Sequence, residues 1–154
     1  MTTAVQKVLI VEDDEHKIDD LTDLLNAHNG KYSLEIKKSV REAIICVKNS
    51  DFDVVLLDMS LPNFDQTAAA AGGSGQPQGG LEIIRMLKRI KKNPAIIIVS
   101  QYPQMEFDGR FHSLKDSANI IKDKYDVNVV GSVLYLVGSL NWQPLLEDFL
   151  RQLR

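Results

Sequence analysis

Carboxylates follow directly on two apolar segments of this chain. The acidic segment Glu12–Asp14 comes after the run 8–11, and Asp58 comes after the run 54–57. Aliphatic runs of this length are typical of strands buried on both faces in a parallel sheet, and ligands bind beyond the carboxyl ends of such strands. If the two strands are neighbours, their acids converge, and each like-charge pair at ~4 Å costs roughly 4 kcal/mol at an effective dielectric constant of ~20. We therefore predict that this acidic cluster binds a divalent cation such as Mg²⁺ or keeps some carboxyls protonated.

Length and composition favour one globular domain spanning residues 1–154. Hydrophobic residues make up 44% of the chain and charged residues 25%, and the net charge is −3 without a basic cluster beside aromatics. These values argue against nucleic-acid binding. The apolar runs are too short for a membrane span, residues 1–6 lack a signal-peptide pattern, and Cys46 is the lone cysteine. We therefore expect a protein of the cytoplasm that has no internal disulfide and no membrane contact.

Predicted strands and helices alternate along the chain. Strands are expected at 8–11, 32–37, 54–57, 96–99 and within 127–137. Helices are expected over the apolar stripe Ile18, Leu21, Leu24 and Leu25, after the capping box Ser39–Glu42, over Leu81–Ile90, within 114–124, and over Pro144–Leu153. This alternation predicts a parallel sheet with helices on both faces, and the wetter alternation in 32–37 predicts an edge strand.

Two long connections interrupt this alternation. Residues 66–80 are poor in bulky side chains and are expected to form a flexible insertion, which is either a tolerated surface loop or a lid that contacts a partner. Residues 101–126 form an extended connection before the last strand, and we expect Phe107, Phe111 and Leu114 to hold it against the domain.

Four segments in order give the chain a family resemblance. VLIVEDDE, FDVVLLDMSLP, GGLEIIRMLK and IIIVSQ lie between residues 8 and 101. Together they resemble the receiver domain of two-component response regulators. The resemblance implies an α/β fold of the flavodoxin-like class, a three-layer α/β/α sandwich around a five-stranded parallel sheet of order 2-1-3-4-5.

The resemblance also implies roles for the acidic residues. Asp58 matches the phosphoacceptor, which takes a phosphoryl group from a sensor histidine kinase or a phosphotransfer protein. Glu12, Asp13, Asp58 and the backbone carbonyl of Ser60 match the Mg²⁺ ligands. Such a domain signals by contact with a downstream protein, which this sequence does not identify, or as a homodimer, and it is not a turnover enzyme.

Two further positions match the family's switch residues. Ser100 follows the fourth predicted strand, where the family has a hydroxyl that binds the phosphoryl group; its alternative role is to end the strand in a turn. Tyr135 matches either the aromatic residue that moves inward behind that hydroxyl or an ordinary half-buried strand tyrosine.

The chain departs from the family pattern at the end of the last strand. The family has Lys followed by Pro there, whereas the matching segment 135–138 of this chain carries no charge. Either the fixed cation is missing, or it comes from the preceding connection, which offers Lys115, Lys122 and Lys124. Without it, a bound phosphoryl group would have fewer charge-assisted hydrogen bonds, each contributing about 1.5–3 kcal/mol.

Two alternative functions remain open. One is a degenerate receiver that acts as a phosphorylation-independent interaction module, which the missing lysine favours. The other is a metal-dependent phosphohydrolase, a family that usually has a second Asp two residues after its nucleophile, where this chain has Ser60.

Overall fold

The computed structural model describes residues 4–61 and 79–153. Within them, the strands are β1 (Gln6–Val11), β2 (Tyr32–Lys37), β3 (Val54–Leu57), β4 (Ala95–Ser100), β5 (Gln104–Phe107), β6 (Arg110–Ser113) and β7 (Val129–Leu134). The helices are α1 (Glu15–Asn26), α2 (Val40–Asn49), α3 (Gly79–Arg89), α4 (Leu114–Tyr125) and α5 (Trp142–Gln152). No described helix has both the length and the apolar character needed to cross a membrane.

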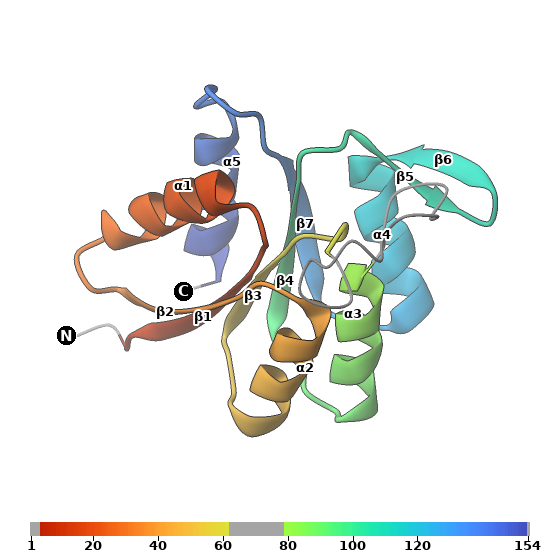
Figure 1. Ribbon diagram of the computed structural model, residues 1–154, viewed down its shortest axis with the longest axis horizontal. Helices are drawn as coiled ribbons and strands as arrows, with labels where there is room; N and C mark the ends of the chain where they lie inside the picture. Colours follow the sequence, from red (N-terminus) through yellow and green to blue (C-terminus); the bar gives the residue numbers. More distant parts are fainter. Residues whose placement is uncertain (1–3, 62–78, 154) are drawn as a thin grey trace.

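The main sheet is parallel and has the order β2-β1-β3-β4-β7 (Figure 1). Because β7 is the fifth strand of this sheet, the predicted order 2-1-3-4-5 and the α/β/α sandwich are confirmed. Helices α1 and α5 cover one face, and α2, α3 and α4 cover the other (Figure 1). Every residue of β3 and β4 is buried, whereas the edge strand β2 is mostly half-buried, as its alternating sequence predicted.

Alternation along the strands divides the core into two clusters. Leu9 and Val55 face the helices α2 to α4, whereas Ile10, Leu56 and Val99 face α1 and α5. The side-chain period of two in a strand explains this division.

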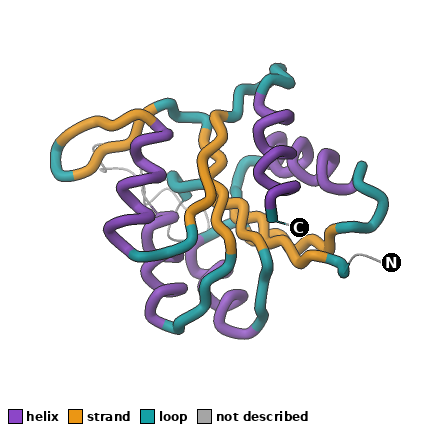
Figure 2. Tube along the Cα trace, turned by 180° about the vertical axis from the view of Figure 1, so that it is seen from behind, coloured by secondary structure: helices purple, strands orange, loops and turns teal. Residues whose placement is uncertain are grey.

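The connection 101–126 contains a β-hairpin that the sequence analysis did not predict. Strands β5 and β6 pair antiparallel and lie beside α4, apart from the main sheet (Figures 1 and 2). Asp108 and Gly109 form its turn with φ of 52° and 78°, the left-handed backbone of the two-residue turns that join hairpin strands. Phe107 is buried as predicted, but Phe111 is 67% exposed, so its predicted role in holding the segment was wrong.

The start of α3 packs tightly against the chain that follows β3. A Cβ atom on Gly80 would lie 2.7 Å from the Cα atom of Met59 and 3.0 Å from the carbonyl oxygen of Asp58. Only glycine fits so close to a backbone, so this position fixes the helix beside Asp58. Of the predicted insertion 66–80, residues 66–78 lie outside the described part of the chain, and the prediction was wrong for 79–80, which are the buried first residues of α3.

Candidate functional site

The acidic ends of β1 and β3 lie side by side. Val11 pairs with Leu57 in the parallel register, and the amide of Asp58 donates to the carbonyl oxygen of Val11 at 3.0 Å. Among the described residues, oxygen atoms of Glu12, Asp13 and Asp58 lie within 4.8 Å of one another. The predicted convergence of the acidic strand ends is therefore confirmed.

Glu12 is buried and fixed at the bottom of this cluster. Its Oε2 accepts hydrogen bonds from the amides of Asp13 at 3.0 Å and Asp14 at 3.1 Å, and its Oε1 forms an ion pair with Lys17. Burial raises the pKa of Glu12 to about 8; the Lys17 ammonium opposes this shift, and the Asp58 carboxylate adds to it. The charge balance of the site is therefore sensitive to any added cation.

The two carboxylate oxygens of Asp58 differ in their contacts: one accepts hydrogen bonds from Ser60, and the other accepts none from the described residues. Its Oδ1 accepts from the amide and the hydroxyl of Ser60, at 3.1 and 2.9 Å. Its Oδ2 is buried, and no atom of the described residues donates a hydrogen bond to it. A buried carboxylate oxygen without a partner is costly, so this arrangement favours a ligand that is an electrophile or a cation.

A lysine that the sequence analysis did not consider completes the cluster. Lys17 is 1% exposed, and its Nζ lies against Glu12 and 3.9 Å from Oδ1 of Asp58. The same Nζ donates to the carbonyl oxygen of Val99 at 2.7 Å and to Oε1 of Gln101 at 3.0 Å. The signal was its spacing: Lys17 stands four residues before Leu21 and seven before Leu24, on the apolar stripe of α1.

The lysines predicted as replacements for the family's cation lie elsewhere. Lys115, Lys122 and Lys124 are all exposed on α4, which covers the face opposite to α1. That prediction was wrong, because the cation beside the carboxylates enters from α1, as Lys17.

Ser100 and Tyr135 do not form a switch pair in this structure. The hydroxyl of Ser100 donates to the carbonyl oxygen of Tyr102 at 3.2 Å and accepts from its amide at 2.9 Å, within the turn after β4. Tyr135 packs with Val99 on the α1 and α5 face, and its hydroxyl donates to Asp20. Ser100 pairs with the residue before Tyr135, so the alternation of side chains sends the two to opposite faces. Of the two alternatives for Tyr135, the one that places it behind the Ser100 hydroxyl as a switch residue is wrong for this reason.

The three carboxylates fit a magnesium ion. Mg²⁺ prefers hard oxygen ligands and is usually bound by one or two carboxylates while keeping several waters. Asp13 is partly exposed, whereas Oδ2 of Asp58 is buried and accepts no hydrogen bond from the described residues. The cluster therefore offers the metal one carboxylate near solvent and one buried carboxylate oxygen.

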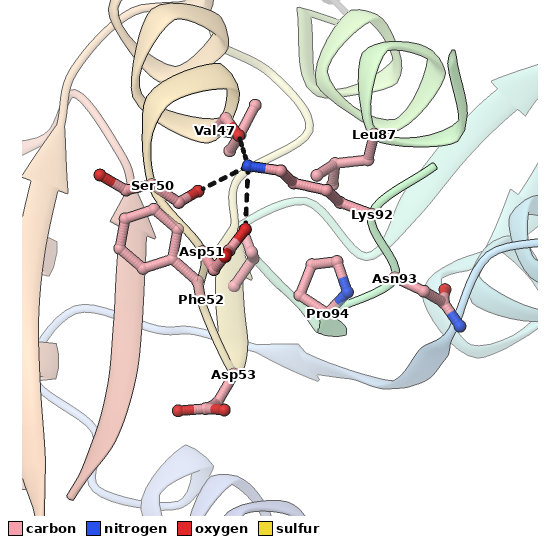
Figure 3. A pocket seen from close by; sticks show the side chains of 10 residues that line it. Val47, Ser50, Asp51, Phe52, Asp53, Leu87, Lys92, Asn93 and Pro94 are labelled. Atoms are coloured by element: carbon pink, nitrogen blue, oxygen red, sulfur yellow. Dashed lines mark hydrogen bonds and ion pairs between the residues drawn. The ribbon is translucent and has the colours of Figure 1, made fainter. Parts of the chain in front are cut away.

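A pocket at the opposite end of the strands has a different character (Figure 3). There Lys92 donates to the carbonyl oxygens of Val47 at 2.7 Å and Ser50 at 3.1 Å, and forms an ion pair with Asp51 at 2.9 Å (Figure 3). These contacts satisfy carbonyls at the end of α2. The pocket lacks the acids of the strand tips, so we assign the chemistry to the other end.

Comparison with known proteins agrees with this geometry. The family model for the response regulator receiver domain matches residues 8–124. Two curated proteins called "Detocs response regulatory protein DtcB" are similar along most of their length. The protein from Vibrio alginolyticus is 27% identical, over 94% of this chain and 99% of its own, and that from Enterobacter cloacae (strain JD6301) is 29% identical, over 89% and 93%.

Solved structures show the same fold. A CheY-like response regulator receiver domain protein from Methanospirillum hungatei JF-1 matches with a TM-score of 0.65 and 18% identity, over 97% of this chain and 94% of that one. The phosphorylated cyanobacterial phytochrome response regulator RcpA matches with a TM-score of 0.66 and 16% identity, over 94% and 91%.

Proposed function

This chain belongs to the response regulator receiver family, and from that premise we propose that it accepts a phosphoryl group on Asp58 in an Mg²⁺-dependent reaction. The proposal is carried by the buried Oδ2 of Asp58, which accepts no hydrogen bond from the described residues and lies beside two further carboxylates and a lysine. In the transfer, Oδ2 forms a bond to phosphorus while the bond from phosphorus to the donor's histidine nitrogen breaks.

We assign the metal ligands to Glu12, Asp13, Asp58 and the backbone carbonyl of Ser60. Bound there, Mg²⁺ would neutralise charge on the carboxylates and the phosphoryl oxygens. The chain's own contribution is positioning: the amide and hydroxyl of Ser60 hold Oδ1 and so fix the carboxylate, while the buried Oδ2 accepts no hydrogen bond from the described residues.

The proposed partners follow from this chemistry. The phosphoryl donor is a sensor histidine kinase or a phosphotransfer protein, and the signal passes to a downstream protein through contact or through a homodimer. The chain does not turn over a substrate. A cytoplasmic location agrees with Cys46, which is buried and is the chain's one cysteine.

Mass spectrometry after incubation with acetyl phosphate and Mg²⁺ tests this proposal. We expect the wild-type protein and an Asp53→Asn control, altered at the opposite end of β3, to gain the mass of one phosphoryl group. Asp58→Asn, or wild type with a chelator, should gain none. Absence of the added mass in wild type at every magnesium concentration, or its persistence in Asp58→Asn, would contradict the proposal.

A second candidate function is a receiver that no longer switches. The separation of Ser100 and Tyr135 on opposite faces of the sheet favours it. Hydrogen exchange with and without beryllofluoride separates the two candidates. A phosphorylation-dependent receiver should change exchange rates in residues 100–113, whereas a constitutive module should bind the ligand without such a change.

A further inference from the structure

We propose that Lys17 is the fixed cation of the phosphoryl site, supplied from the first turn of α1 in place of the lysine that the family has at the end of its last strand. This inference rests on the proposed function and adds to it a residue outside the family's motif. It also explains how the chain can lack the strand-end lysine and still offer a positive charge beside Asp58.

The helix start places Lys17 in the site. Asp14 is the N-cap of α1, and its carboxylate accepts from the amides of His16 and Lys17 at 2.9 and 3.3 Å. The cap fixes the first turn immediately after Glu12 and Asp13, so the Lys17 side chain points from the helix into the carboxylate cluster.

Helix stability does not explain a buried lysine at this position. The first turn is the positive end of a helix dipole, where a cation is unfavourable, and removing an ammonium from water is costly. The compensation comes from the site itself: Glu12 and Asp58 supply negative charge, and Val99 and Gln101 accept the remaining hydrogen bonds.

The end of β7 has the complementary feature. Leu134 pairs with Ser100, so Tyr135 is the next residue beyond the paired strand, and its fully buried ring centroid lies 5.9 Å from Nζ of Lys17. The Tyr135 hydroxyl is held by Asp20 of α1. The strand end therefore carries an uncharged ring, and the positive charge of the site comes from the Lys17 ammonium of α1, which lies near that ring.

This geometry gives Lys17 a role in binding and in transmission. At 3.9 Å from Oδ1 of Asp58, the ammonium is too far for a hydrogen bond, so it can donate instead to an oxygen of an added phosphoryl group. If the Lys17 ammonium moves toward the phosphoryl group, it breaks its hydrogen bond to Gln101 or to the carbonyl oxygen of Val99. Phosphorylation would thereby loosen the chain between β4 and the β5–β6 hairpin.

The proposal is tested by measuring the affinities for Mg²⁺ and for beryllofluoride, which should change in opposite directions when Lys17 is replaced. Lys17→Met removes the charge and Lys17→Gln keeps an amide donor, so the second variant serves if the first does not fold; Lys38→Met, which alters an exposed lysine, is the control. The fluorescence of Trp142, the one tryptophan, reports binding because its ring lies 5.3 Å from that of Tyr135. Titrations use Mg²⁺ alone, then beryllofluoride with saturating Mg²⁺.

We expect both Lys17 variants to bind Mg²⁺ at least ~10-fold more tightly, because a competing cation is gone, and beryllofluoride about 10- to 100-fold more weakly. A general loss of structure would weaken both. Affinities equal to those of Lys38→Met, or two shifts in one direction, would overturn the inference. If wild type itself does not bind beryllofluoride, the proposed function fails, while the Mg²⁺ comparison still decides whether Lys17 is the cation of the site.

Discussion

Two lysines at opposite ends of the sheet bind the same kinds of atoms in different surroundings. Lys17 contacts a backbone carbonyl and two carboxylates and is 1% exposed. Lys92 contacts two backbone carbonyls and one carboxylate, but its side chain is 29% exposed and that of its partner Asp51 is 89% exposed (Figure 3).

The two lysines therefore differ in solvent access rather than in the kinds of atoms that they contact. Lys92 lies at the carboxyl end of α2, where a cation favours the helix, and water screens its ion pair. Lys17 lies at the amino end of α1, and the two acids that pair with it, Glu12 and Asp58, are buried. A bound metal or phosphoryl group therefore changes the balance around Lys17 and leaves Lys92 unaffected.

The largest difference should appear in stability. Lys17→Met leaves Glu12 and Asp58 buried without their cation, so we expect the metal-free protein to lose about 3–5 kcal/mol of unfolding free energy. Urea denaturation measures this, and adding Glu12→Gln to the same variant should restore part of the loss. A loss no larger than that of Lys92→Met would remove the distinction between the two ends.

The next difference concerns pH. Burial raises the pKa of Glu12 from 4.5 to about 8, so the folded chain holds this proton more tightly than the unfolded chain. The contribution of Glu12 to stability is therefore full below about pH 4.5 and is lost as the pH rises toward 8. Mg²⁺ affinity should rise over the same range, by at most about tenfold per pH unit, because the metal displaces the proton.

Calorimetric titration with Mg²⁺ between pH 6 and 9 checks this prediction, with Glu12→Gln as the control that should bind weakly at every pH. A pH-independent affinity in wild type would contradict it. Asp51 should show the opposite sign, since its hydrogen bond to Lys92 lowers its pKa, and its contribution to stability is lost as the pH falls.

A smaller effect is expected from Lys92→Met. The change removes two hydrogen bonds to carbonyls of α2 in a site that water reaches, so we expect a loss of about 1 kcal/mol. Thermal unfolding measures it, and Mg²⁺ binding should stay at the wild-type value. A changed metal affinity would mean that the two ends of the sheet are coupled.

The smallest effect should come from Asp51→Asn. Its carboxylate is exposed, so the change should be detectable only at low ionic strength and should vanish in salt. Comparing unfolding midpoints at low and high salt checks this, and a salt-independent loss would contradict it.

The sequence predicted those features that depend on periodicity. The strand order came from the family resemblance, whereas continuous apolar runs predicted β1 and β3, the alternation of elements predicted a parallel sheet with helices on both faces, and acids at the strand ends predicted the cluster. Each prediction other than the strand order follows from local patterns together with the rule that parallel strands end at one edge.

Features that depend on side-chain direction were missed. Lys17 is a charged residue on an apolar helix stripe, and only the packed structure shows that its long side chain ends among buried carboxylates. Tyr135 required the register of β7, where a shift of one residue changes the face. The hairpin had a readable signal, Asp108–Gly109 between alternating residues, that was overlooked.

A crystal structure of the wild-type protein with Mg²⁺ and beryllofluoride would show whether Lys17 contacts the group bound to Asp58. We predict one metal ion held by Glu12, Asp13, Asp58 and the backbone carbonyl of Ser60, a beryllofluoride group on Asp58, and Nζ of Lys17 within hydrogen-bond distance of a fluorine atom. A ligand bound elsewhere, or a Lys17 side chain directed away from it, would contradict this account.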